Sequence, residues 1–263
     1  MTLDQLLLSL RIAPETVQLF FLILVRMAGV ITALPPMDMR GVPAMAKVGL
    51  TMGLTLMVYP LLSGNPPPPA SGTVALGLMV LIEAGLGLFY GLFIRLLFAG
   101  VQLAGQLAGF QMGFAIVNVM DPVSSSQMSI TGQILNIFSL LAFVMLDMHH
   151  AVIRVVVLGF SIAPPGTWSP GPGAAALMNA AGAEMFTTAL KIGAPVIAAL
   201  LLTSVAFGLM ARTVPQMNIF FVAMPMKILV GLFFMALSLT YFWPALDPLF
   251  YGMIRRMLRL SAG

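Results

Sequence analysis

The side chains that could carry out chemistry in this sequence are few, and the most compact group is Asp147, His149 and His150. Carboxylate and imidazole groups act as general acids, general bases and metal ligands. Neighbouring residues of a helix point about 100° apart, so we expect His149 and His150 not to chelate one metal ion. The sequence also lacks the H-E-x-x-H, G-x-S-x-G and phosphate-loop motifs. We therefore expect no catalysis, no cofactor and no bound metal in this chain.

A second group of such side chains consists of charges inside long apolar runs: Arg26, Glu83, Arg95, Lys191 and Lys227. A charge at the centre of a bilayer costs about 3 kcal/mol, so such residues normally face water or protein. They could line an ion or proton pathway, as in a transporter, or form buried contacts in a multi-subunit assembly. Snorkelling near helix ends is a third explanation, which suits Arg95 and Lys227 best. Glu83 and Arg95 are 12 residues apart, too far to pair on one helix, so a partner must come from another segment.

These residues belong to a very apolar chain. Of its 263 residues, 60% are apolar and 8% are charged, whereas about 25% of the residues of a soluble domain are charged. This composition excludes an ordinary soluble domain and a disordered chain. The net charge of +4 comes from scattered basic residues with one cluster at Arg255, Arg256 and Arg259, so we expect a membrane and no nucleic acid as partner. The absence of cysteine excludes disulfide bonds and thiol chemistry.

Long apolar runs predict an all-α, polytopic membrane protein of about six spans. The runs cover residues 17–34, 44–62, 73–117, 128–146, 151–163, 182–210 and 219–245. The run 73–117 is too long for one span, and it predicts either one very long helix or a helical hairpin. The run 151–163 is too short to span alone, so it either continues from 128–146 or is re-entrant. Prolines inside the runs, such as Pro195 and Pro225, predict kinked or broken helices.

Three further segments organise the chain. Two segments rich in proline and glycine, 63–72 and 163–173, predict extended surface linkers that divide the single unit 1–263 into thirds. At the C-terminus, apolar residues recur at helical spacing from Leu246 to Leu258, with arginines between them. This pattern predicts an amphipathic basic helix over about 246–260, which serves either as a membrane-surface anchor or as a docking helix for a partner.

The stretch 102–133 combines a helix with a polar loop. Gln102 and Gln106 share a helix face, and glycines at 100, 105 and 109 allow close packing against another helix. The helical pattern then weakens into a segment with Asp121-Pro122 and a run of serines. Such residues are typical of an exposed turn between helices. A flexible segment that closes a pore is the alternative that we leave open here.

The joint order of these features resembles the FliR family of flagellar biosynthesis proteins, which is grouped with the T subunit of virulence type III secretion systems. The resemblance covers essentially the whole chain and rests on the order of many short segments. These segments are Arg26, Ala33–Met37, Val42–Pro43, Lys47–Leu50, Pro60, Glu83, Gly87, Arg95, Gln102, Gln106, Gln111–Phe114, Asp121–Pro122, Gly132–Gln133, Leu146–His150, Pro195 and Ala211–Asn218.

The resemblance implies a channel-forming subunit of the flagellar type III export gate, in the bacterial inner membrane and within the flagellar basal body. The implied fold joins a FliP-like part to a FliQ-like part as helical hairpins, packed into a helical multi-subunit gate. The implied partners are FliP and FliQ type subunits and export proteins of the FlhA and FlhB type, with unfolded flagellar subunits as the exported substrates. In such an assembly the five charges named above become buried contacts, and no ion pathway is needed.

The resemblance also implies that the loop between the long middle helices plugs the channel. The matching positions are Phe110, Gln111, Met112, Gly113, Phe114, Asn118, Met120, Asp121, Pro122 and Gln127. Met120 stands where the family commonly has Phe, and Met148 stands where it commonly has Gly, so the side chains that form the seal remain open.

Alternative functions remain at this point. The runs 147–150 and 211–218 favour the flagellar branch over a virulence T subunit. A stand-alone secondary transporter would use the intramembrane charges at a midplane site, but such transporters usually contain internal repeats, and we find none. An enzyme using Asp147, His149 and His150 is the most remote alternative.

Overall fold

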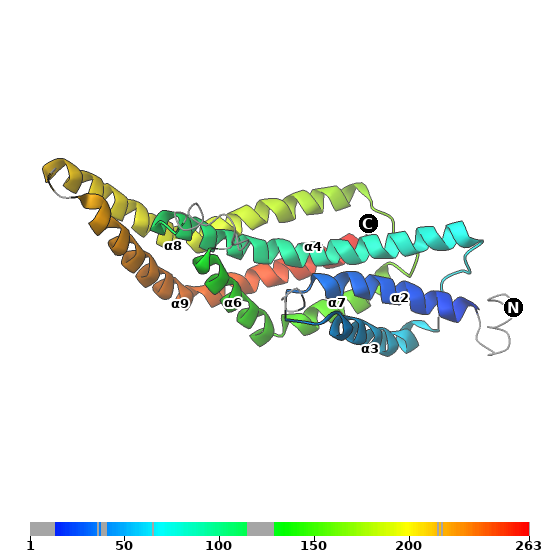
Figure 1. Ribbon diagram of the computed structural model, residues 1–263. Coiled ribbons are helices and arrows are strands. Elements are labelled where there is room, and N and C mark those ends of the chain that lie inside the picture. Colours follow the sequence, from blue (N-terminus) through cyan, green and yellow to red (C-terminus); the bar gives the residue numbers. More distant parts are fainter. Residues whose placement is uncertain are drawn as a thin grey trace. The chain divides into compact units, whose positions relative to one another are not determined.

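The computed structural model describes residues 14–35, 37, 41–64, 66–114, 129–214, 216 and 218–262, and these residues form helices, turns and coil with no strand (Figure 1). The helices are α2 (Pro14–Ala33), α3 (Ala44–Leu62), α4 (Thr73–Met112), α6 (Ile130–Met145), α7 (Met148–Ile162), α8 (Pro172–Thr213) and α9 (Ile219–Ser261). The prediction of an all-α fold is therefore confirmed.

Five of these helices are long and apolar enough to cross a membrane: α2, α3, α4, α8 and α9. The helices α6 and α7 form a bent pair with a break at Leu146–Asp147, and this pair makes a sixth candidate if it is one span. The short run 151–163 thus belongs to a helix that follows directly on 130–145. The predicted count of about six spans agrees with this result.

Within the run 73–117, residues Thr73–Met112 form one helix of 40 residues, α4. Its length is about 60 Å, twice the roughly 30 Å thickness of the hydrocarbon core of a bilayer. The helices α8 and α9 are of similar length, with 42 and 43 residues. Pro195 and Pro225 lie inside α8 and α9 and do not end them.

The chain packs as two compact units. The first comprises Met1–Arg95, Asp147–Ala180 and Gly252–Gly263, and the second comprises Leu96–Leu146 and Ala181–Tyr251. The borders fall inside α4, α8 and α9 and at the α6–α7 turn, so the packing does not follow the predicted division into thirds at the linkers. A linker is read from local composition, whereas compact units depend on which distant segments pack together.

In the first unit, α2 packs closely against α4. A Cβ atom added to Gly87 of α4 would lie 2.5 Å from the backbone oxygen of Arg26 in α2, and one added to Gly29 would lie 2.8 Å from the Gly87 carbonyl carbon. Only glycine allows two helix backbones to approach so closely. The helix α3 lies on the other side of this contact, where Tyr59 meets Phe20 of α2 edge to face at 6.2 Å.

Both linkers contact the helices of the first unit. The Gln18 side chain of α2 donates from Nε2 to the Pro68 carbonyl at 3.2 Å and accepts from the Ala70 N–H at 3.0 Å. In the second linker, Trp168 is 5% exposed, meets Phe89 of α4 at 5.9 Å and donates from Nε1 to the Leu260 carbonyl at 2.9 Å. Trp168 is therefore a core residue within a segment, 163–173, that is otherwise mostly exposed or half-buried.

In the second unit, three aromatic side chains join α4, α6 and α9. The rings of Phe98, Phe143 and Phe250 are 5.7 to 6.2 Å apart in each pair. All three side chains are buried. Aromatic pairs at these separations stabilise a core beyond the effect of the area they bury.

Candidate functional site

A buried ion pair joins α2 and α4 in the first unit. Arg26 Nη2 donates to Glu83 Oε1 at 2.9 Å, and Arg26 Nε donates to the other carboxylate oxygen. Both side chains are fully buried. The partner of Glu83 thus lies on another segment of the chain, and it is Arg26.

Further contacts surround the pair. Arg26 Nη2 also donates to the Ala163 carbonyl at 3.1 Å, and the guanidinium lies 4.0 Å from the centre of the Phe160 ring of α7. Glu83 Oε1 accepts from the Gly166 N–H at 2.7 Å. Within the described residues, Arg26 Nη1 is the one polar atom of the pair without a hydrogen bond. The pair therefore holds α2, α4, α7 and the second linker at one point.

The other three charges, Arg95, Lys191 and Lys227, are exposed or half-buried in this chain. Arg95 is exposed on α4 and donates to the Thr32 carbonyl of α2 at 3.3 Å. Lys191 is exposed on α8, beside a mostly apolar cavity of about 280 Å³ that is lined by residues of α8 and α9. Lys227 is half-buried on α9. If these three charges are buried contacts, groups outside the described residues must cover them.

The segment 110–127 starts from a fixed helix end. The N–H of Phe114 donates to the Gly109 carbonyl and the N–H of Gly113 to the Phe110 carbonyl, both at 3.1 Å, while Gly113 adopts φ 93°. This pair of hydrogen bonds is a Schellman motif, which ends a helix at a glycine of positive φ. Met112 is fully buried and contacts Gly231 of α9, whereas Phe110 is 60% exposed.

The chain returns at the start of α6, beside the same part of α4. Ser129 caps α6 by accepting from the Gly132 N–H at 3.0 Å, and Thr131 Oγ1 donates to the Gly105 carbonyl at 2.6 Å. A Cβ atom on Gly105 would lie 2.5 Å from Gly132 Cα. Both ends of the segment are thus held in the second unit. Gln111, Gly113 and Phe114 are half-buried at its start, and the predicted positions Asn118, Met120, Asp121, Pro122 and Gln127 lie outside the described residues.

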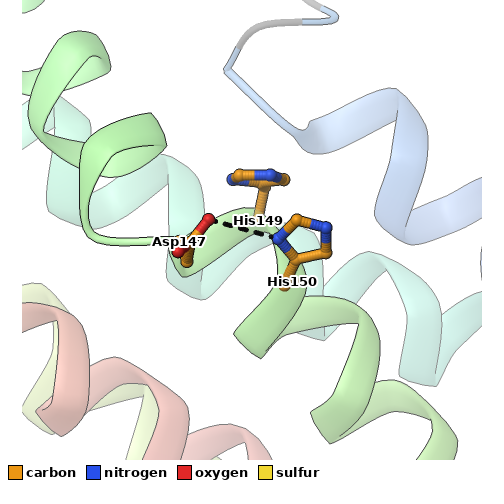
Figure 2. A group of neighbouring side chains, drawn as sticks. All are labelled: Asp147, His149 and His150. Carbon is orange, nitrogen blue, oxygen red and sulfur yellow. Dashed lines mark hydrogen bonds and ion pairs between the residues drawn. The ribbon is translucent and has the colours of Figure 1, made fainter.

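Asp147, His149 and His150 gather at the N-terminal turn of α7 (Figure 2). The carboxylate of Asp147 and the ring of His150 point toward each other, with Oδ1 and Nδ1 3.3 Å apart. The two imidazole rings lie 4.1 Å apart between centres. The rings lie close although the Cα–Cβ bonds of neighbouring helix residues point about 100° apart, because side-chain rotation sets the ring positions.

The C-terminal segment 246–260 is helical and amphipathic, but it continues α9 and does not form a separate helix. Its apolar residues are buried within this chain: Leu246, Phe250, Met253, Met257 and Leu260. Arg255 and Arg259 are exposed. These five residues pack on other helices of the same chain, whereas Leu249, Ile254 and Leu258 of the same stripe are half-buried.

Several contact residues were missed from the sequence. Phe160 and Gly166 contact the buried ion pair, Trp168 packs on Phe89 of α4, and Ser261 bonds to Tyr90 of α4. A tryptophan within a linker of proline, glycine and serine is a signal that could have identified Trp168 as buried. No local signal marks the other three, because their partners lie far away in the sequence.

Comparisons with known proteins give a consistent result. The family described as bacterial export proteins, family 1, matches residues 17–253. Flagellar biosynthetic protein FliR of Bacillus subtilis (strain 168) is 30% identical over 92% of this chain and 94% of its own length. The FliR protein of Escherichia coli (strain K12) is 32% identical over 88% of this chain and 88% of its own length. That of Caulobacter vibrioides is 28% identical over 83% of this chain and 87% of its own length.

Proposed function

Since the chain belongs to the bacterial export proteins of family 1, together with the FliR proteins, we propose that it is a channel-forming subunit of the flagellar type III protein export gate. In this role it passes unfolded flagellar subunits across the bacterial inner membrane at the flagellar basal body. It catalyses no reaction itself. The observation that carries the proposal is the family match, which extends over nearly the whole chain.

The burial of the helices supports a multi-subunit role. In the most apolar 18-residue stretch of α9, 11% of the stretch is buried within this chain. In the corresponding stretch of α2, 44% is buried. Large apolar side chains are exposed along both α8 and α9, among them Leu202, Phe221 and Phe233. Exposed apolar surface of this extent is covered by lipid or by other proteins. We propose that FliP and FliQ type subunits cover part of it, and that FlhA and FlhB type proteins adjoin the assembled gate.

The geometry around 110–127 supports the assignment of this segment as the plug. A plug must move or deform without releasing its attachment, so its two ends need firm anchors. The Schellman motif at Gly113 and the cap at Ser129 supply them, and both lie beside α4. Phe110, exposed at the base of the segment, offers an apolar surface to a pore.

The transporter alternative receives less support. Its midplane site would use charges such as Arg26 and Glu83, but these two are fully buried and bonded to each other. The virulence alternative is also weaker, because the relatives described above are named as flagellar proteins.

Isolation of the assembly tests the proposal. The full chain, tagged at its C-terminus, is co-expressed with the FliP, FliQ, FlhA and FlhB type proteins of its own genome and extracted in mild detergent. We expect recovery in one large assembly that contains the FliP and FliQ type subunits. An unrelated polytopic membrane protein with the same tag is the control and recovers neither. A lone or dimeric chain, with the partners present in the same membranes, would contradict the proposal and favour the transporter.

A further inference from the structure

We propose that Asp147, His149 and His150 form a binding site for one divalent transition-metal ion of the zinc class. Each residue offers one ligand atom, and these atoms all lie within 4.8 Å of one another. Figure 2 shows the three side chains on one side of the first turn of α7, with the His149 ring beside the Asp147–His150 contact. None of the three residues takes part in the ion pair of Arg26 and Glu83.

The distances fit a tetrahedral ion after a small side-chain adjustment. Zinc binds nitrogen and oxygen ligands at about 2.0–2.1 Å, so two ligands on a tetrahedral ion lie roughly 3.3 Å apart. Asp147 Oδ1 and His150 Nδ1 are 3.3 Å apart in this structure. The remaining ligand separations lie within 4.8 Å, so binding requires rotations of the side chains that shorten them.

The backbone prepares the carboxylate for this role. Asp147 adopts the left-handed conformation with φ 54°, the one positive φ among the described non-glycine residues. It precedes α7 in the N-cap position, yet its carboxylate accepts no hydrogen bond from a backbone N–H of the described first turn of α7. An N-cap aspartate normally accepts such a bond. The carboxylate of Asp147 instead faces His150.

His149 supplies a second, independent observation. Its Nδ1 atom is buried and has no hydrogen-bond partner among the residues that the structure describes. Buried polar atoms without a partner are rare in folded proteins, and an ion is one explanation for them. A plain ion pair between Asp147 and a protonated His150 does not account for His149. With both side chains about two-thirds exposed or more, that pair would also contribute little to stability.

The ligand set selects the class of ion. Two imidazoles and one carboxylate suit zinc, cobalt, nickel or copper, whereas calcium and magnesium take oxygen ligands. Three protein ligands leave one tetrahedral position for water or for a group from another subunit. The bound ion would connect Asp147, at the break between α6 and α7, to His149 and His150 in the first turn of α7.

Cobalt titration of the full chain tests the site. The chain carries a tag without histidine, is purified in mild detergent and is titrated with Co²⁺, whose tetrahedral complexes absorb strongly in the visible range. We expect one Co²⁺ per chain with this absorption, displaced by Zn²⁺. The sequence contains two histidines and no cysteine, so imidazole ligation by this chain must come from His149 and His150.

Three variants identify the ligands. Loss of a group that only hydrogen-bonds a metal ligand weakens metal binding roughly 10- to 100-fold. We expect a larger loss of Co²⁺ affinity in each of the variants His149→Gln, His150→Gln and Asp147→Asn, because each removes a ligand itself. Asn tolerates the left-handed conformation, so Asp147→Asn preserves the turn, and circular dichroism checks the helix content of each variant. Glu15→Gln removes an exposed carboxylate elsewhere and is the matched control. Absence of the tetrahedral absorption in the unaltered chain, or its persistence in the His149→Gln/His150→Gln double variant, would overturn the proposal.

Discussion

At the scale of single residues, the buried pair of Arg26 and Glu83 shows what a sequence can predict about an intramembrane charge. The apolar surroundings of both residues predicted that each needs a partner. The partner itself lies 57 positions away and is reached through the close contact at Gly29 and Gly87. The remaining contacts come from Phe160 and the second linker, which no periodicity connects to Arg26.

The first prediction concerns removal of this pair. Arg26→Met or Glu83→Leu alone leaves one buried charge without its partner, which costs about 3–5 kcal/mol. The double variant leaves no charge, so we expect it to be less destabilised than either single variant. Thermal unfolding in detergent and recovery of the assembled complex measure both effects. A double variant that assembles fully but no longer supports export would instead indicate an ion pathway through the pair.

At the scale of elements, close helix contacts were more predictable than the surroundings of linkers and tails. The glycines of the stretch 100–109 predicted close packing, and Gly105 does meet Gly132 of α6. In the C-terminal part of α9, buried apolar residues alternate with exposed arginines. What covers an apolar stripe depends on the fold of distant segments. The pattern alone therefore could not predict that Phe250 of this stripe packs on Phe98 and Phe143 instead of on a membrane surface.

The second prediction compares two glycines of α4. In Gly105→Ala the new Cβ meets the Gly132 backbone, which cannot yield as a flexible side chain does, so we expect a loss of about 1–3 kcal/mol. Gly85→Ala is the matched control, because a Cβ at Gly85 meets no atom within 4 Å. Alanine favours the helix there by about 1 kcal/mol over glycine. Melting temperatures that move in the same direction for both variants would contradict the α4–α6 contact.

The third prediction tests the C-terminal part of α9. Phe250 is fully buried and Tyr251 is 53% exposed, although they are neighbours. We expect Phe250→Ala to destabilise the chain by about 3–5 kcal/mol through the cavity it leaves. Tyr251→Ala is expected to change stability by less than about 0.5 kcal/mol, as exposed substitutions usually do. Equal thermal stability of the two variants would support a surface anchor, against the packing described here.

At the scale of the whole molecule, composition and the order of motifs predicted the all-α membrane fold and the family, and both are confirmed. The function of exposed helix faces could not be derived from the chain alone, since whatever covers α8 and α9 lies outside it. For the same reason, the exposure of Lys191 in the single chain does not decide its surroundings in an assembly. The central claim therefore concerns the assembled gate and its plug.

The most direct measurement of that claim is the ion conductance of membranes that contain the assembled complex. Residues 116–126 are replaced by a short glycine–serine segment, which leaves the Schellman motif at Gly113 and the cap at Ser129 intact. The unaltered complex and a complex carrying Gly85→Ala are the controls. We expect the shortened variant to assemble normally and to leak ions, while both controls stay closed. Unchanged conductance in a fully assembled shortened variant would contradict the role of this segment as the plug.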